Sequence, residues 1–215
     1  MASEVDICNV ALSFLGDKAA VTSISPPEGK SPQADHCARF YPMAVQEILQ
    51  SFPWSFATAR ATLAELKTKP DSVQFAYALP TNCLRLLHVF GAPGIPCRSW
   101  SIERSANGLM LITKEPADHV VYTTSRVAAS QFPPAFVEAL CHLLASKLAG
   151  AVIPGGTGMD LMTKHLQAYD LYAQRAMKLD ARQEQETIRF PTPYTGDLAP
   201  MGRYGDFGGD YGFDR

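Results

Sequence analysis

This chain of 215 residues lacks several features common in nucleic-acid-binding, membrane and exported proteins. Its 19 Lys and Arg do not outnumber its 21 Asp and Glu, and the net charge of −2 leaves no basic excess to grip nucleic acid phosphates. No uninterrupted apolar run reaches the ~18 residues of a membrane span. The start, "MASEVDICNVALSFLG", is acidic where a signal peptide needs positive charge. We therefore expect no membrane insertion and no export.

The sequence also lacks the patterns that mark most metal and cofactor sites. Its five cysteines are widely spaced and include no CxxC pair, which indicates reduced, mostly buried thiols in a cytosolic setting. Its five histidines fit no HExxH or Cys/His metal spacing. The glycines of "PGGTG" have neither a P-loop nor a Rossmann context. We expect no metal and no cofactor.

Catalytic groups are sparse as well. Cys141 and His142 are neighbours, but adjacent positions on a helix do not face each other, and the apolar surroundings favour a core thiol. The acids Glu103, Glu115 and Asp118 lie near expected turns, where surface carboxylates are common. We interpret the chain as a non-enzyme with no catalytic residue.

What the sequence does contain is a set of amphipathic helices near its start. Ser3 is expected to cap a first helix that Gly16 stops. Ser31 is expected to cap a second helix, which Pro42 should kink or split. The residues expected on the buried face of the first helix are Ile7, Val10, Ala11 and Phe14.

Short apolar runs divided by turn signals replace this pattern from about residue 63 to residue 125. "VQFAYAL", "CLRLLHV", "RSWSI", "LMLIT" and "HVVYTT" read as strands of a small antiparallel sheet. "SANG" favours a hairpin turn, because Asn and Gly tolerate positive φ.

Helices return after the strands. Pro133 and Pro134 mark the start of a strongly apolar helix, which "GAVIPGGTG" breaks. Asp160 is expected to cap a last long helix. The residues expected on its buried face are Met162, Leu166, Tyr169, Ala173 and Ala176.

These segments predict an α+β fold, in which N- and C-terminal helices form one bundle, a small antiparallel β subdomain is inserted, and an extended C-terminal arm follows. The expected division is 1–62 for the first helices, 63–130 for the β subdomain, 131–186 for the later helices and 187–215 for the arm.

Trp54 and Phe56, in "SFPWSFATARATL", lie where the second helix hands over to the strands. Two large aromatic side chains there favour a structural anchor that fixes the exit of the chain. A binding site is the alternative, but it would need convergent polar groups that the sequence does not reveal.

Several collinear segments up to about residue 183 carry a family resemblance. They are "EVDICNVALSFLG", "ADHCARFYPMAVQEILQSFPWSFATARATLA", "FAYALPTNCLRLLHV", "FPPAFVEALCHLLASKLA" and "YDLYAQRAMKLDA". Together they resemble the tail tubular protein A family, the head-to-tail adaptors of short-tailed (podoviral) bacteriophages. The loop "SPPEGKSP" is longer than that family suggests, and nothing after residue 187 matches it.

The resemblance implies a structural virion protein, assembled in the host cytoplasm and located at the neck between head and tail. Twelve copies would form a ring beneath the portal protein, and the ring would receive the tail nozzle, a tail tubular protein B-like component. Phage DNA would pass through the central channel during ejection without sequence-specific binding. No catalytic site is implied.

The arm ends in "GRYGDFGGDYGFDR", in which glycine alternates with aromatic residues. Glycine lets a backbone follow a partner's surface closely, and aromatic residues dominate interface energetics. We expect the arm to contact the portal or a neighbouring subunit; the alternative is a disordered, solubilising tail. The expected anchors are Tyr194, Tyr204, Phe207, Tyr211 and Phe213.

Two other functions stay open at this point. A tail-associated cell-wall hydrolase would place its chemistry at Glu103, Glu115 or Cys141. A DNA-binding regulator would need a basic recognition helix, and the second helix offers only Arg39.

Overall fold

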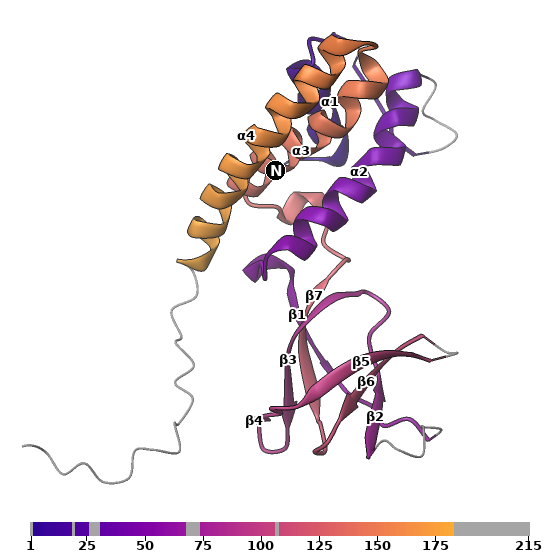
Figure 1. The fold of residues 1–215 in the computed structure, drawn as a ribbon, viewed down its shortest axis with the longest axis vertical. Coiled ribbons are helices and arrows are strands. Elements are labelled where there is room, and N and C mark those ends of the chain that lie inside the picture. Colours follow the sequence, from indigo (N-terminus) through magenta and orange to yellow (C-terminus); the bar gives the residue numbers. More distant parts are fainter. Residues whose placement is uncertain (1, 19, 26–30, 68–73, 106–107, 183–215) are drawn as a thin grey trace, which may run out of the picture. The chain divides into compact units, whose positions relative to one another are not determined.

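The fold is α+β, as the sequence predicts (Figure 1). The computed structural model describes residues 2–18, 20–25, 31–67, 74–105 and 108–182. Within these ranges the chain forms four α-helices and two small antiparallel sheets. The described helices and strands belong to one compact unit. The expected arm residues all lie outside the described ranges.

The first helix, α1 (Glu4–Phe14), begins as its sequence predicts. The Ser3 hydroxyl accepts a hydrogen bond from the Asp6 backbone N–H at 3.1 Å, and the Asp6 carboxylate accepts one from the Ser3 N–H at 2.9 Å. This reciprocal capping box satisfies two backbone donors at the helix start. Gly16 follows the helix with a φ of 78°, a conformation that glycine adopts without strain.

The buried face of α1 differs from the predicted one. Val10 and Phe14 are 41% and 38% exposed. The helix packs mainly on a later helix and turns a different stripe towards it. Phe14 instead stacks on two histidine rings at the edge of that contact. The residues buried from α1 are Ile7, Cys8, Ala11 and Leu12.

The second helix, α2 (Pro32–Ser51), is not split. Ser31 caps it by accepting a hydrogen bond from the Ala34 N–H at 3.1 Å. Pro42 lies inside the helix, which continues for two further turns beyond it. Of the kink or split predicted at Pro42, the split does not occur, because the core contacts of Ile48 and Leu49 hold the later turns in place.

Helix α3 (Pro134–Val152) is the centre of the helical part, and α1, α2 and α4 (Gly156–Ala181) each pack against it. Figure 1 shows α3 between α2 and α4. By length and composition α3 could cross a membrane, although Glu138 and Lys147 interrupt its apolar run. Its burial against three helices accounts for that composition. The predicted apolar stripe is buried, as expected: Phe136, Leu140, Leu143, Leu144 and Leu148.

Helix α4 begins earlier than predicted. It starts at Gly156, directly after Gly155, whose φ is 85°, so Asp160 lies in the second turn and caps nothing. The predicted buried face is right for Ala173 and Ala176 and wrong for Met162 and Leu166, which stay exposed. Along much of its length α4 packs against α3 and against no other helix of the described chain. The buried stripe of α4 is therefore narrow.

The strands form two antiparallel sheets, in the order β1-β7-β3-β4 and β2-β6-β5. The first strand begins before residue 63, where the sequence indicated the first strands. Its sequence, "TARAT", has no apolar residues other than alanine, yet all five residues pair with β7. The strands are β1 (Thr58–Thr62), β2 (Phe75–Ala78), β3 (Cys83–Gly91), β4 (Ile95–Pro96), β5 (Trp100–Ser105), β6 (Gly108–Thr113) and β7 (His119–Thr124).

The two sheets share a small core of their own. Ser105 pairs with Gly108, which confirms the hairpin expected at "SANG", although Ala106 and Asn107 lie outside the described residues. The core residues come from both sheets, as in a pair of sheets packed face to face. They are Tyr77, Leu86, Val89, Cys97, Leu111, Val120 and Tyr122.

Candidate interaction surfaces

Trp54 lies in the core between α2 and α3, with 1% of its surface exposed. Its indole N–H donates to the Ile48 carbonyl at 2.7 Å, which satisfies the one polar atom of the ring. Its ring and that of Phe56 both meet Phe136 edge to face, at centroid distances of 5.0 and 4.9 Å. Large aromatic contacts of this kind hold the start of the short η1 turn (Ser55–Ala57) against α3.

A hydrogen-bonded link joins this junction to the end of α4. The Asp180 carboxylate accepts from the Ser55 N–H at 2.8 Å and from the Ser55 hydroxyl at 2.7 Å. Asp180 is 6% exposed, and 125 residues separate the two partners. The link ties the last turn of α4 to the segment that leads into β1.

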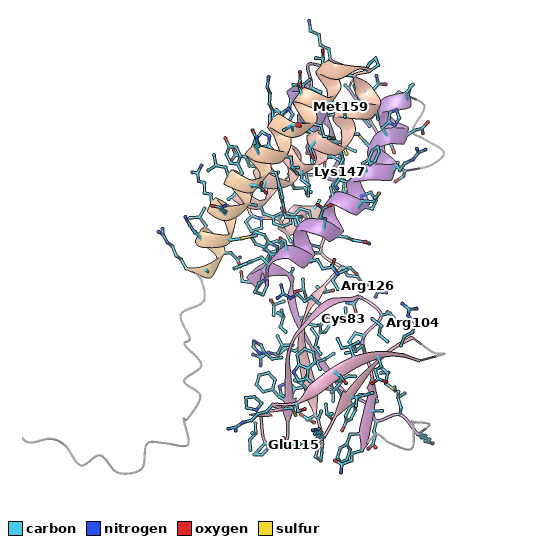
Figure 2. All side chains as sticks on the ribbon, in the orientation of Figure 1. Cys83, Arg104, Glu115, Arg126, Lys147 and Met159 are labelled. Carbon is cyan, nitrogen blue, oxygen red and sulfur yellow. The ribbon has the colours of Figure 1, made fainter. Side chains whose placement is uncertain are left out.

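Two of the acids near the expected turns, Glu103 and Glu115, do not form a pair. In the β5–β6 hairpin, Glu103 pairs with Met110 near the turn, whereas Glu115 follows the opposite end of β6. Figure 2 shows Arg104, the neighbour of Glu103, and Glu115 at opposite ends of this hairpin. A carboxylate pair flanking a scissile bond needs a separation below ~10 Å. Asp118 contacts its own neighbour His119 at 3.2 Å.

Two buried thiols of the helical core, those of Cys8 and Cys141, are poor nucleophiles. Cys141 is 1% exposed, and burial raises the pKa of its thiol to about 12. A hydrogen bond to Cys37 and burial raise the pKa of the Cys8 thiol. All five cysteines are free. Within the described ranges, no group of three or more His, Cys, Asp or Glu side chains is placed to hold a metal ion.

Two histidines that sequence spacing left apart meet between α3 and α4. The Nδ1 atoms of His142 and His165 are 3.2 Å apart. Phe14 stacks on both rings, and Tyr172 stacks on His142 at a centroid distance of 4.8 Å. Burial and the neighbouring His165 lower the pKa of His142, and Glu138 opposes the shift. The cluster fixes the α1 side of the α3–α4 contact.

Apolar side chains remain exposed along one side of α4, and we call them the α4 stripe: Met159, Met162 and Leu166. Their exposed fractions are 66%, 40% and 46%. Their spacing of three and four places them on one face. Figure 2 labels Met159 near the start of the helix. Leu171 is also exposed, at 67%, but its position places it on another face of α4.

Contacts on either side of α4 show which flank bears this stripe. Tyr169 lies close to Ser51 and Glu47 of α2, whereas His165 and Tyr172 face α1 and α3. A helix turns ~100° per residue, so the α4 stripe lies on the flank nearer α2.

A second apolar surface lies on the α1 side. A hollow of about 640 Å³ is lined there mostly by apolar groups, and we call it the α1 groove. Val10 and Phe14 of α1 form one wall, and Val137 of α3 contributes to the other. Residues of α1, of α3 and of the segment before α3 line the α1 groove, so the groove and the α4 stripe are two different surfaces.

No protein-family model matches the chain. A search of curated proteins also found no match.

Sequence reasoning missed the histidine pair, the Asp180–Ser55 link and both apolar surfaces. Periodicity assigns a large apolar residue to the core by default, so it placed Met162, Leu166 and Phe14 inside. The histidines and the link join residues far apart in the chain, and no local spacing signals such contacts.

Proposed function

We propose that this protein is a structural head-to-tail adaptor of a short-tailed bacteriophage. Copies form a ring, of twelve subunits by family resemblance, between the portal and the tail nozzle, and DNA passes through its channel. In this proposal the N- and C-terminal helices form one bundle, and the β part is an insertion that reaches a neighbouring component.

The observation that carries the proposal is the pair of different apolar surfaces on one subunit. A closed ring needs a head-to-tail interface, in which one patch meets a different patch of the next copy. The α4 stripe projects Met159, Met162 and Leu166, and the α1 groove is a hollow with apolar walls. Exposed apolar patches of this sort mark association surfaces. Seating the stripe of one copy in the groove of the next gives a heterologous contact.

Assembly of the purified protein with its portal protein tests the proposal. We expect mass measurement to detect a ring on the portal, and imaging of intact particles to find the protein at the neck. Leu166→Glu should weaken assembly about a hundredfold, because it buries a charge in an apolar contact. Leu171→Glu, at a more exposed leucine on another face, should leave assembly unchanged.

Two results would contradict the proposal. One is the absence of any complex with portal while the chain is folded. The other is equal assembly by the Leu166 and Leu171 variants, which would remove the α4 stripe from the interface.

The arm supplies the second attachment in this proposal. Deleting residues 194–215 removes all five expected aromatic anchors. We expect a folded monomer that no longer attaches to the portal or to the adjacent subunit. Unchanged attachment of the deleted chain would show that the arm is only a tail.

A further inference from the structure

A hollow of about 520 Å³ on the outer face of the β1-β7-β3-β4 sheet has the features of a binding site. Arg85 and His88 of β3 contribute its charged and titratable groups, and none of the described residues that line it is acidic. Pro53 and Leu87 supply apolar wall. Ligand sites combine such apolar walls with a few convergent polar groups, in volumes of ~300–1,000 Å³.

The sheet beneath this hollow contains a polar atom without a partner. Thr123 pairs with Thr58 on one side and with Arg85 on the other. Directly paired residues project from the same face of a sheet, and both Thr58 and Arg85 line the hollow. Thr123 is 0% exposed, and its hydroxyl has no hydrogen-bond partner within the part of the chain described. A buried hydroxyl left unpaired costs ~1–3 kcal/mol, so an acceptor that reaches it is favoured.

The charge of the site selects an acidic occupant. Arg85 has a planar guanidinium suited to a carboxylate, and it forms no ion pair with another described residue. The hollow beside Trp54 makes a useful comparison, because Glu138 and Asp180 line it together with Arg175. An acidic ligand is therefore favoured at the β-sheet hollow and not at that one.

One segment of this chain has matching chemistry. Residues 204–214, "YGDFGGDYGFD", contain three Asp and four aromatic residues and no Lys or Arg. An aromatic ring fits the apolar wall, and an adjacent carboxylate can pair with Arg85. The described chain stops at Arg182, 22 residues before Tyr204. At ~3.4 Å per residue this tether spans at most about 75 Å, enough to reach a neighbouring subunit.

We propose that the hollow formed by Arg85, His88 and Thr58 binds the acidic aromatic segment 204–214 of a neighbouring copy of this chain. The proposal rests on the proposed ring and names the docking place of its arm. In this docking one aspartate pairs with Arg85, and an aromatic residue beside it contacts Pro53 and Leu87. The same carboxylate accepts a hydrogen bond that the Thr123 hydroxyl donates.

Photo-crosslinking of full-length chains on the portal tests this docking. A photo-reactive amino acid replaces Leu87 in an unlabelled chain, which is mixed with chain labelled with ¹⁵N. We expect ¹⁵N-labelled peptides from residues 204–214 to be attached at position 87. The same amino acid placed at Leu171, an exposed site on α4, should capture none of them.

Charge variants sharpen the test. Arg85→Glu should lower the crosslink yield about tenfold, and Asp206→Arg with Asp210→Arg in the labelled chain should restore much of it. Arg60→Glu is the matched control, because Arg60 is exposed on the same sheet but does not line the hollow. That control should retain the yield of the natural sequence.

Each alternative outcome has a defined meaning. This docking is overturned if the chain assembles on the portal but forms no crosslink to residues 204–214. It is also overturned if the crosslinks go only to the portal or only to the unlabelled arm. Both results leave the proposed adaptor function standing. Equal effects of the Arg85 and Arg60 variants also overturn this docking. Failure of the chain to assemble at all overturns both proposals.

Discussion

Removing the Asp180 carboxylate should loosen the junction between the helices and the first strand. Asp180→Ala leaves the Ser55 N–H and hydroxyl without the acceptor that now lies 2.8 and 2.7 Å away. Asp180→Asn keeps the shape of the side chain: its oxygen can accept from the N–H, and its NH₂ can donate to the hydroxyl. The two variants therefore separate the hydrogen bonds from the charge.

The size of the effect follows from the two contacts. A hydrogen bond to a charged group contributes ~1.5–3 kcal/mol. Ser55 is exposed, so water partly replaces the lost acceptor and the lower value applies to each bond. Against this, a carboxylate in the last turn of a helix is disfavoured by ~0.3–1 kcal/mol. Asp180→Ala should thus lower the free energy of unfolding by about 2.5 kcal/mol, and Asp180→Asn by about 1 kcal/mol.

Denaturant titration of the variants measures these differences, and thermal melting should show the Tm of Asp180→Ala about 5–10 °C lower. Ser55→Ala completes a double-mutant cycle, in which we expect a coupling of about 1.5 kcal/mol. Additive effects of the Asp180 and Ser55 changes would refute the reasoning. A loss below about 0.5 kcal/mol for Asp180→Ala would do the same.

Two further predictions concern the helices. Gly158→Ala should destabilise the protein by about 2 kcal/mol or more, because a Cβ there would overlap the Ile153 carbonyl oxygen. At Gly156 an added Cβ meets nothing within 4 Å, so Gly156→Ala should be neutral or stabilising. Thermal melting of the two variants measures the difference. The lowered pKa of His142 means that the folded state binds a proton less readily than the unfolded chain, so this contribution to stability is complete above pH ~6.5 and is lost as the pH falls below it. His142→Gln should flatten that part of the stability–pH profile, and an unchanged profile would show that the contact with His165 does not control it.

Local patterns in the sequence were sufficient for much of the fold. The cap at Ser3, the stop at Gly16 and the start of α3 were all predicted, because each depends on residues within one helical turn. The mixed α+β class follows from the change of period near residue 63. The weakly apolar β1 escaped prediction, because its stability comes from pairing with β7 and not from its own composition.

Neighbouring residues alone therefore specified the element types, the caps at Ser3 and Ser31, the strongly apolar composition of α3 and the lack of recognisable metal or catalytic motifs in the sequence. Tertiary packing settled which apolar side chains stay outside and brought His142 to His165. It also placed Arg85 and Thr58 beside Thr123, whose hydroxyl has no partner among the described residues. Those facts depend on the rotation of helices about their axes and on strand register, and both are set by packing between segments distant in the chain.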